Sequence, residues 1–349
     1  MMNASEEKDV ELQKLLIEED GTNKQSPPAN KAEYVSRVKA FTSCVIYSTS
    51  SCSMVLVNKS LASSFNHFLE EGANLNILLV VFQAVITLLA VIFSKKCGWI
   101  EVPKFDKSVA AKWAPINICF CLMLFTGMAS LQHNSVPMVS IFKNLTNILI
   151  TLGDYYFFGK SAELLVWLAF GIMLAGAVFA AREDISITFI GLFWMATNCM
   201  STAGYILYMK HATNTIKLTK FGMIFYNNLL CALFLFPCTI WNGQLDRFLQ
   251  TEALHTFDYA WKNVFAGLIG FLLNFASLNC VENTGPTTYA IVGSLTKIPI
   301  TLLGWYLFKS VITPETWFFI GISMTGGFLY SYAKIKSAKE QEKGQVENK

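Results

Sequence analysis

The chain has 349 residues, of which 53% are apolar and only 15% are charged, and its mean hydropathy is +0.43. A soluble domain carries roughly 25% charged residues, so most of this chain must face lipid or other buried helices. The net charge of +3 is too small to indicate nucleic acid as a partner, and the nine cysteines show no metal-site spacing, so we expect no metal or cofactor.

The predicted elements begin after a polar N-terminal tail, residues 1–37, which is acidic at its start and contains Pro27 and Pro28. Continuously apolar stretches follow, each about long enough to cross a ~30 Å hydrocarbon core as a helix. They cover residues 40–61, 75–94, 110–131, 135–156, 164–181, 186–208, 220–241, 262–281, 286–308 and 315–333. We therefore predict an all-α membrane protein with a ten-helix domain at 38–335, followed by a charged tail at 336–349.

The basic residues indicate the orientation of this domain. One side holds most of them: Lys31, Arg37, Lys39, Lys95, Lys96, Lys104, Lys107, Lys112, Lys160, Lys210, Lys217, Lys220, Lys334 and Lys336. The other side holds four: Arg182, Arg247, Lys262 and Lys309. Because cytosolic loops carry the excess of lysine and arginine, we expect both termini in the cytosol of a multi-pass protein.

An internal repeat appears when the chain is shifted by about 150 residues. Residues 145–177 and 295–327 then share about a dozen identities without a gap, including Trp167 with Trp317 and Gly176 with Gly326. A duplicated unit with an odd number of helices inverts its orientation, so the pattern predicts two inverted five-helix repeats, at about 38–182 and 186–335. Transporters built in this way bind substrate near the middle of the membrane, between the repeats.

Two lysines lie inside predicted spans, Lys143 in the fourth and Lys297 in the ninth. Charges at such depth are costly and usually mark a functional pathway. The repeat aligns Lys297 with Asn147 and Lys143 with Gly293, which predicts that both lysines flank one cavity. With no carboxylate in mid-span, an anionic ligand is the expected partner. Lys59 stands at the end of the first span, where we expect it to snorkel to the interface.

Polar side chains gather in the second half of the chain. Asn227 and Asn228 are adjacent in the seventh span, where two amides together suit the edge of a nucleobase. Further polar residues lie in the sixth and eighth spans: Asn198, Ser201, Thr202, Asn274 and Ser277. Interhelical hydrogen bonding is the alternative interpretation for each of them.

The motifs Phe225-Tyr-Asn-Asn228 and Gly293-Ser-Leu-Thr-Lys297 resemble the paired motifs of Golgi GDP-mannose transporters. These belong to the nucleotide-sugar and triose-phosphate branch of the drug/metabolite transporter superfamily, and the resemblance covers about 40–335. It implies that Asn227 and Asn228 read guanine and that Lys297 meets the diphosphate. It also implies that Tyr289, Gly293 and Ser294 border the mannose and that Asn198, Ser277 and Tyr47 line the pocket. Lys143, Asn274 and the motif residue Thr296 complete the candidate site. Ser294 and Thr296 depart from the usual Ala and Asn, so this chain differs from the family's pattern at the sugar, whereas the Asn pair for the base is intact.

The resemblance implies GDP-mannose as the substrate and the Golgi membrane as the location. The charge of Lys297 and Lys143 makes an empty cavity unfavourable to reorient, so we expect exchange of GDP-mannose for GMP by alternating access. A homodimer is a further expectation. The alternatives are another GDP-sugar, such as GDP-fucose or GDP-arabinose, or a UDP-sugar. A membrane-embedded glycosyltransferase is the alternative from another class. It would need clustered acidic residues or histidines near the membrane, whereas the four histidines lie in connecting regions without acidic partners. We therefore do not expect an enzyme.

Overall fold

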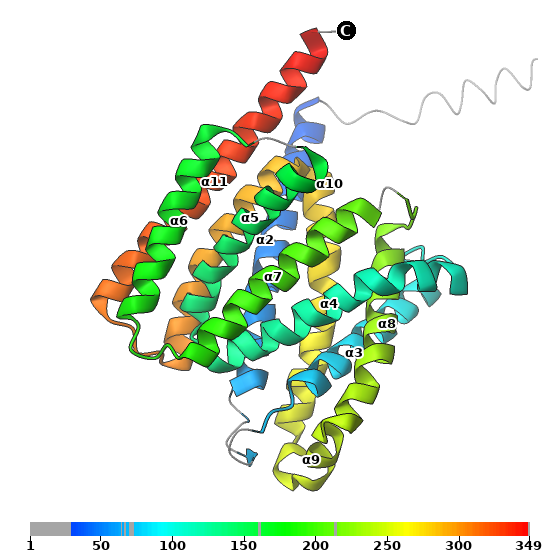
Figure 1. Ribbon diagram of the computed structural model, residues 1–349. Coiled ribbons are helices and arrows are strands. Elements are labelled where there is room, and N and C mark those ends of the chain that lie inside the picture. Colours follow the sequence, from blue (N-terminus) through cyan, green and yellow to red (C-terminus); the bar gives the residue numbers. More distant parts are fainter. Residues whose placement is uncertain are drawn as a thin grey trace, which may run out of the picture.

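The computed structural model describes residues 29–63, 65, 68–69, 73–159, 162–212 and 215–347. Within them every regular element is a helix (Figure 1). The long helices are α2 (Ala29–Ser63), α3 (Asn76–Lys96), α4 (Lys107–His133), α5 (Val136–Phe158), α6 (Leu164–Glu183), α7 (Phe189–Ala212), α8 (Lys220–Trp241), α10 (Phe257–Phe308) and α11 (Pro314–Glu347). Two short elements, α9 (Gln244–Gln250) and η2 (Glu252–Leu254), connect α8 to α10. Most of the predicted N-terminal tail lies outside the described residues, while α2 begins at Ala29, inside the range predicted as tail.

Eight segments of the described chain are long and apolar enough to cross a membrane. They are 37–63, 76–96, 107–133, 136–158, 164–183, 220–241, 257–284 and 291–308. They coincide with eight of the predicted spans and make the chain a polytopic, all-α membrane protein. The other two predicted spans correspond to α7 and to part of α11, which are helical but outside these eight.

Helix α10 differs from the prediction, because its 52 residues are helical without the expected break near 281–286. Its contacts show that it cannot be straight. A Cβ built on Gly270 would lie 3.7 Å from Met54 Cε on α2. The carbonyl oxygen of Thr296 lies 3.9 Å from Cys52 Sγ, also on α2. A straight helix would separate residues 270 and 296 by about 39 Å. The helix therefore bends back, and Figure 1 shows its yellow first part rising and its orange second part descending.

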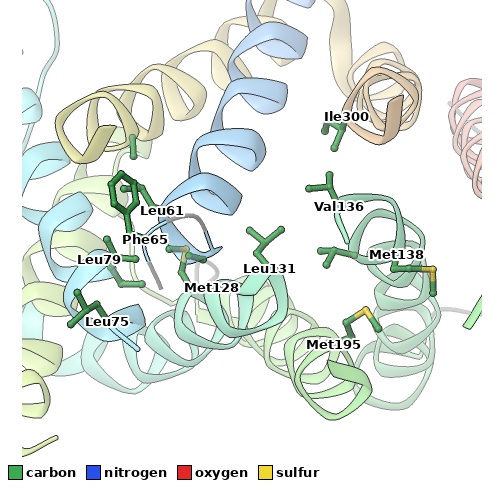
Figure 2. Packing of buried hydrophobic residues seen from close by; sticks show 14 of the residues in the cluster. Leu61, Phe65, Leu75, Leu79, Met128, Leu131, Val136, Met138, Met195 and Ile300 are labelled. Carbon is green, nitrogen blue, oxygen red and sulfur yellow. The ribbon is translucent and has the colours of Figure 1, made fainter. Parts of the chain in front are cut away.

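The helices pack in pairs that join the first half of the chain to the second. Helix α6 packs on α11, α3 on α8, α4 on α7, and α2 on α10, while α5 contacts both α7 and α10. The main core cluster runs through these contacts, and in Figure 2 Val136 of α5 points toward Ile300 of α10. Most of the packing between helices therefore joins the first half of the chain to the second half.

The crossing of α6 and α11 is unusually close because of two glycines. A Cβ on Gly176 would lie 2.5 Å from the backbone nitrogen of Ser323, and one on Gly326 would lie 2.7 Å from that of Met173. The Ser323 hydroxyl also donates to the Met173 carbonyl at 3.2 Å. Met173 and Ser323 are matched by the 150-residue repeat, as are the two glycines. The contact is therefore reciprocal, each glycine facing the equivalent residue of the other helix.

Two buried polar side chains satisfy helix ends. Gln244 Oε1 accepts hydrogen bonds from the backbone N–H groups of Ile77 and Leu78, at 3.1 Å each, in the first turn of α3. Lys59 is only 8% exposed and donates to the carbonyls of Leu131, at 2.6 Å, and Asn134, at 2.9 Å, where α4 ends. The expectation that Lys59 snorkels is therefore wrong, because unpaired carbonyls at a helix end provide a closer partner.

Candidate functional site

A cavity of about 350 Å³ lies between helices from both halves of the chain. Its walls come from α2, α3, α4, α5, α7 and α10. The polar residues that line it are Asn58, Gln83, Lys143, Thr146, Asn147, Asn198, Thr202 and Lys297. The apolar part of the wall comes mainly from α4, including Met123, Met128 and Leu131. Its volume falls within the range of small-molecule pockets, roughly 300–1,000 Å³.

The cavity is cationic, because Lys143 and Lys297 line it and its lining includes no aspartate or glutamate. Lys143 is exposed to the cavity and has no hydrogen-bond or ion-pair partner within the part of the chain that the structure describes. Lys297 donates to Asn144 Oδ1, a neutral group that leaves the ammonium charge uncompensated. Two positive charges in a cavity without a carboxylate, and within the membrane domain, favour an anionic ligand.

Amide side chains shape the rest of the cavity wall. Asn198 donates from Nδ2 to the Met123 carbonyl at 2.9 Å and to the Thr126 hydroxyl at 3.1 Å. Gln83 donates from Nε2 to Asn58 Oδ1 at 3.0 Å. The predicted site residues did not include four that line the cavity: Asn58, Gln83, Thr146 and Asn147. Each is a polar side chain inside an apolar span, which is the signal that could have identified them. Of the predicted site residues, the cavity brings together Lys143, Lys297 and Asn198.

The asparagine pair lies on α8, away from this cavity. Asn227 is buried, and its amide already has two partners: Oδ1 accepts from Trp113 Nε1 at 2.7 Å, and Nδ2 donates to the Tyr205 hydroxyl at 2.9 Å. Asn228 donates to the carbonyl of Ile224 at 2.8 Å. In this conformation the pair therefore makes protein hydrogen bonds within α8 and between α8, α4 and α7.

A second group of predicted residues meets where α10 packs on α2. The rings of Tyr47 and Tyr289 are 4.7 Å apart, and the Tyr47 hydroxyl lies 3.4 Å from an ideal Cβ on Gly293. The hydroxyls of Thr296 and Ser48 are 2.8 Å apart. Thr296 directly precedes Lys297 in α10, and Gly293 lies four residues before it, so this group adjoins Lys297 along the helix.

The remaining predicted residues stand apart or make other contacts. The Ser294 hydroxyl lies 2.5 Å from that of Ser331 on α11. Asn274 is exposed and donates to the Gly270 carbonyl, one turn earlier in α10, at 2.8 Å. Ser277 is half-buried on the same stretch and does not line the cavity.

A polytopic helical protein with a cationic cavity between its two halves has the construction of a membrane transporter. Comparison with known proteins agrees with this class. Residues 38–331 match the model of the Triose-phosphate Transporter family. Because the match covers most of the chain, the protein belongs to this family.

Its curated relatives include two from Arabidopsis thaliana. The GDP-mannose transporter GONST1 is 31% identical over 305 residues, covering 85% of this chain and 90% of the relative. The GDP-mannose transporter GONST2 is 33% identical, covering 83% and 77%. GDP-mannose transporter 1 of Emericella nidulans is 32% identical, covering 86% and 82%. A solved structure, described only as a crystal structure of a protein, superposes with a TM-score of 0.51 at 12% identity, which shows the fold alone.

Proposed function

We propose that this protein carries GDP-mannose across the Golgi membrane in exchange for GMP. The observation that carries the proposal is the cationic cavity bounded by Lys143 and Lys297, in a chain similar over most of its length to GDP-mannose transporters from a plant and a fungus. A nucleotide sugar and a nucleoside monophosphate are both anions of about two charges. Either can supply the negative charge that these ammonium groups lack.

We propose that the transport domain, residues 38–335, has ten crossings in two inverted repeats, 38–182 and 186–335. Two of the crossings are the two parts of the bent α10. The packing pattern supports this arrangement, because the equivalent helices α3 and α8, and α6 and α11, pack on each other. In addition, the contact of α4 with α7 corresponds to that of α10 with α2. The reciprocal contacts of Gly176 and Gly326 are those expected beside a two-fold axis.

We propose that both termini face the cytosol, with the tails 1–37 and 336–349 outside the membrane. The excess of lysine and arginine on that side supports this orientation. The spans predicted from the sequence, at about 20 residues each, suit the thinner membranes of the early secretory pathway, which supports the Golgi as the location. We also propose that the protein forms a homodimer.

Exchange follows from the electrostatics of the cavity. An empty cavity holds two ammonium groups without a carboxylate, so moving the empty carrier between its two open states exposes uncompensated charge to the membrane interior. A bound GDP-mannose or GMP neutralises that charge. The loaded carrier therefore reorients by rocking of one repeat against the other, and net movement of either ligand requires the return of the other.

Recognition of the ligand is proposed for the residues that the family motifs mark. Lys297 contacts the diphosphate and Lys143 adds positive charge beside it, while Tyr289, Gly293 and Ser294 border the sugar. Tyr47 lines the same pocket, and Thr296 belongs to this region. For Asn227 and Asn228 to read guanine, the amide of Asn227 must exchange its bonds to Trp113 and Tyr205 for bonds to the base. Recognition of guanine is thus coupled to the breaking of these two hydrogen bonds between α8 and its neighbours α4 and α7.

Ligand-dependent thermal stabilisation of the purified protein tests this assignment. GMP and GDP-mannose are expected to raise the unfolding temperature, whereas UMP, CMP and UDP-sugars at equal concentration are not. GDP-fucose and GDP-arabinose measure how strictly the sugar is read. Stabilisation by uridine nucleotides in place of guanosine nucleotides would refute the assignment of the base, and stabilisation by none of them would refute the class of substrate.

A further inference from the structure

Asn144 stands at the junction of the two repeats, and neither the motifs nor the relatives' names give it a role. We infer that Asn144 is the resting partner of Lys297: it holds the ammonium group in the empty carrier and releases it to the phosphates of the substrate. This inference rests on the exchange proposed above. It makes Asn144 a positioning residue, because it acts on the ligand through Lys297.

The geometry separates Asn144 from the binding surface. Successive residues of a helix point about 100° apart, so Lys143 faces the cavity while Asn144, only 1% exposed, faces α10 and α11. A Cβ on Gly327 of α11 would lie 3.1 Å from Asn144 Nδ2, so this glycine admits the amide. Lys297 reaches both environments, since it lines the cavity and donates to Asn144 Oδ1.

The chemistry of an amide suits this role. A hydrogen bond from an ammonium group to a neutral carbonyl oxygen fixes its position and partly replaces its hydration. It does not cancel the charge, so a phosphate, whose charged oxygens bind more strongly, can displace it. An aspartate at the same position would neutralise Lys297 permanently. The neutral side chain thus keeps the empty cavity positively charged while preventing the lysine from remaining unpaired.

Two substitutions of Asn144 are expected to change the KM for GDP-mannose in opposite directions. Asn144→Ala removes the competitor for Lys297, so the KM for GDP-mannose in proteoliposomes should fall about three- to tenfold, and kcat should fall because product leaves more slowly. Asn144→Asp supplies a counter-ion, so KM should rise by about tenfold or more. The Asp variant should also take up GDP-mannose without internal GMP, since its empty cavity can reorient.

The matched control is Asn263, a buried asparagine of α10 whose amide donates to the Tyr259 carbonyl at 2.9 Å and does not line this cavity. Its Ala and Asp substitutions should leave KM and the requirement for GMP unchanged. Affinity for GMP, measured by thermal stabilisation, provides a second readout. In a Lys297→Met background, replacing Asn144 should no longer change that affinity.

A wild-type protein that does not exchange GMP for GDP-mannose would refute the proposed function itself. If the wild type exchanges normally but both substitutions shift KM in the same direction, only the role of Asn144 is refuted. An effect on GMP affinity that persists without Lys297 would refute it equally, because a merely structural role predicts that result.

Discussion

The crossing of α6 and α11 allows a prediction with internal controls. Replacing Gly176 by Ala places a methyl group 2.5 Å from the backbone nitrogen of Ser323, and replacing Gly326 places one 2.7 Å from that of Met173. Neither neighbour is a flexible side-chain end, so the two helices must move apart. Overpacking of this kind lowers the free energy of unfolding by about 1–3 kcal/mol. The better helix propensity of alanine offsets about 1 kcal/mol of that loss. We expect a net loss of up to about 2 kcal/mol for either substitution.

The same two helices supply the controls. Gly171 and Gly321 are also matched by the repeat, and a Cβ at either position meets nothing within 4 Å. Their alanine substitutions should be neutral or stabilising by up to about 1 kcal/mol. Apparent unfolding temperatures, measured by size-exclusion chromatography after heating in detergent, should rank both Gly171→Ala and Gly321→Ala above Gly176→Ala and Gly326→Ala. If all four variants were equally stable, the close crossing and the two-fold contact would both be refuted.

Two other substitutions follow from buried polar contacts, and a third follows from the cationic cavity. Lys59→Met should destabilise the protein by about 2 kcal/mol in the same thermal assay, because two carbonyls at the end of α4 lose their donor; wild-type stability would contradict that contact. Gln244→Leu should cost about 1–3 kcal/mol, since it leaves two N–H groups of α3 without an acceptor, and an unchanged unfolding temperature would contradict the cap. Lys143→Ala should reduce GDP-mannose uptake at least about tenfold, with Lys143→Arg less affected and the exposed Lys112→Ala unchanged as control. Uptake by Lys143→Ala equal to that of Lys112→Ala would remove Lys143 from the site.

Much of the architecture could be predicted from local patterns. The apolar segments predicted the membrane helices, because lipid requires each segment to satisfy its own backbone hydrogen bonds. Lys143 and Lys297 could be predicted as neighbours of one cavity because the repeat aligns their surroundings. The continuity of α10 was missed, since a Gly-Pro pair at 285–286 indicates a break between two helices, whereas the chain stays helical through it.

The partners of individual polar groups could not be predicted, because they come from distant parts of the chain. Asn227 is satisfied by Trp113 and Tyr205, and Lys59 by carbonyls more than 70 residues later. A pattern in the sequence cannot distinguish a polar side chain that is hydrogen-bonded within the protein from one whose partner is a bound ligand. The same applies to Asn144, whose bond to Lys297 spans 153 residues.

The most direct test of the central claim is counterflow in proteoliposomes preloaded with GMP and offered labelled GDP-mannose outside. We predict uptake that requires internal GMP, is not supported by internal UMP, and is lost in Lys297→Ala and Asn227→Ala. Uptake that is independent of internal nucleotide, or that survives both substitutions, would contradict the account of an exchanger whose charge and base recognition reside in these residues.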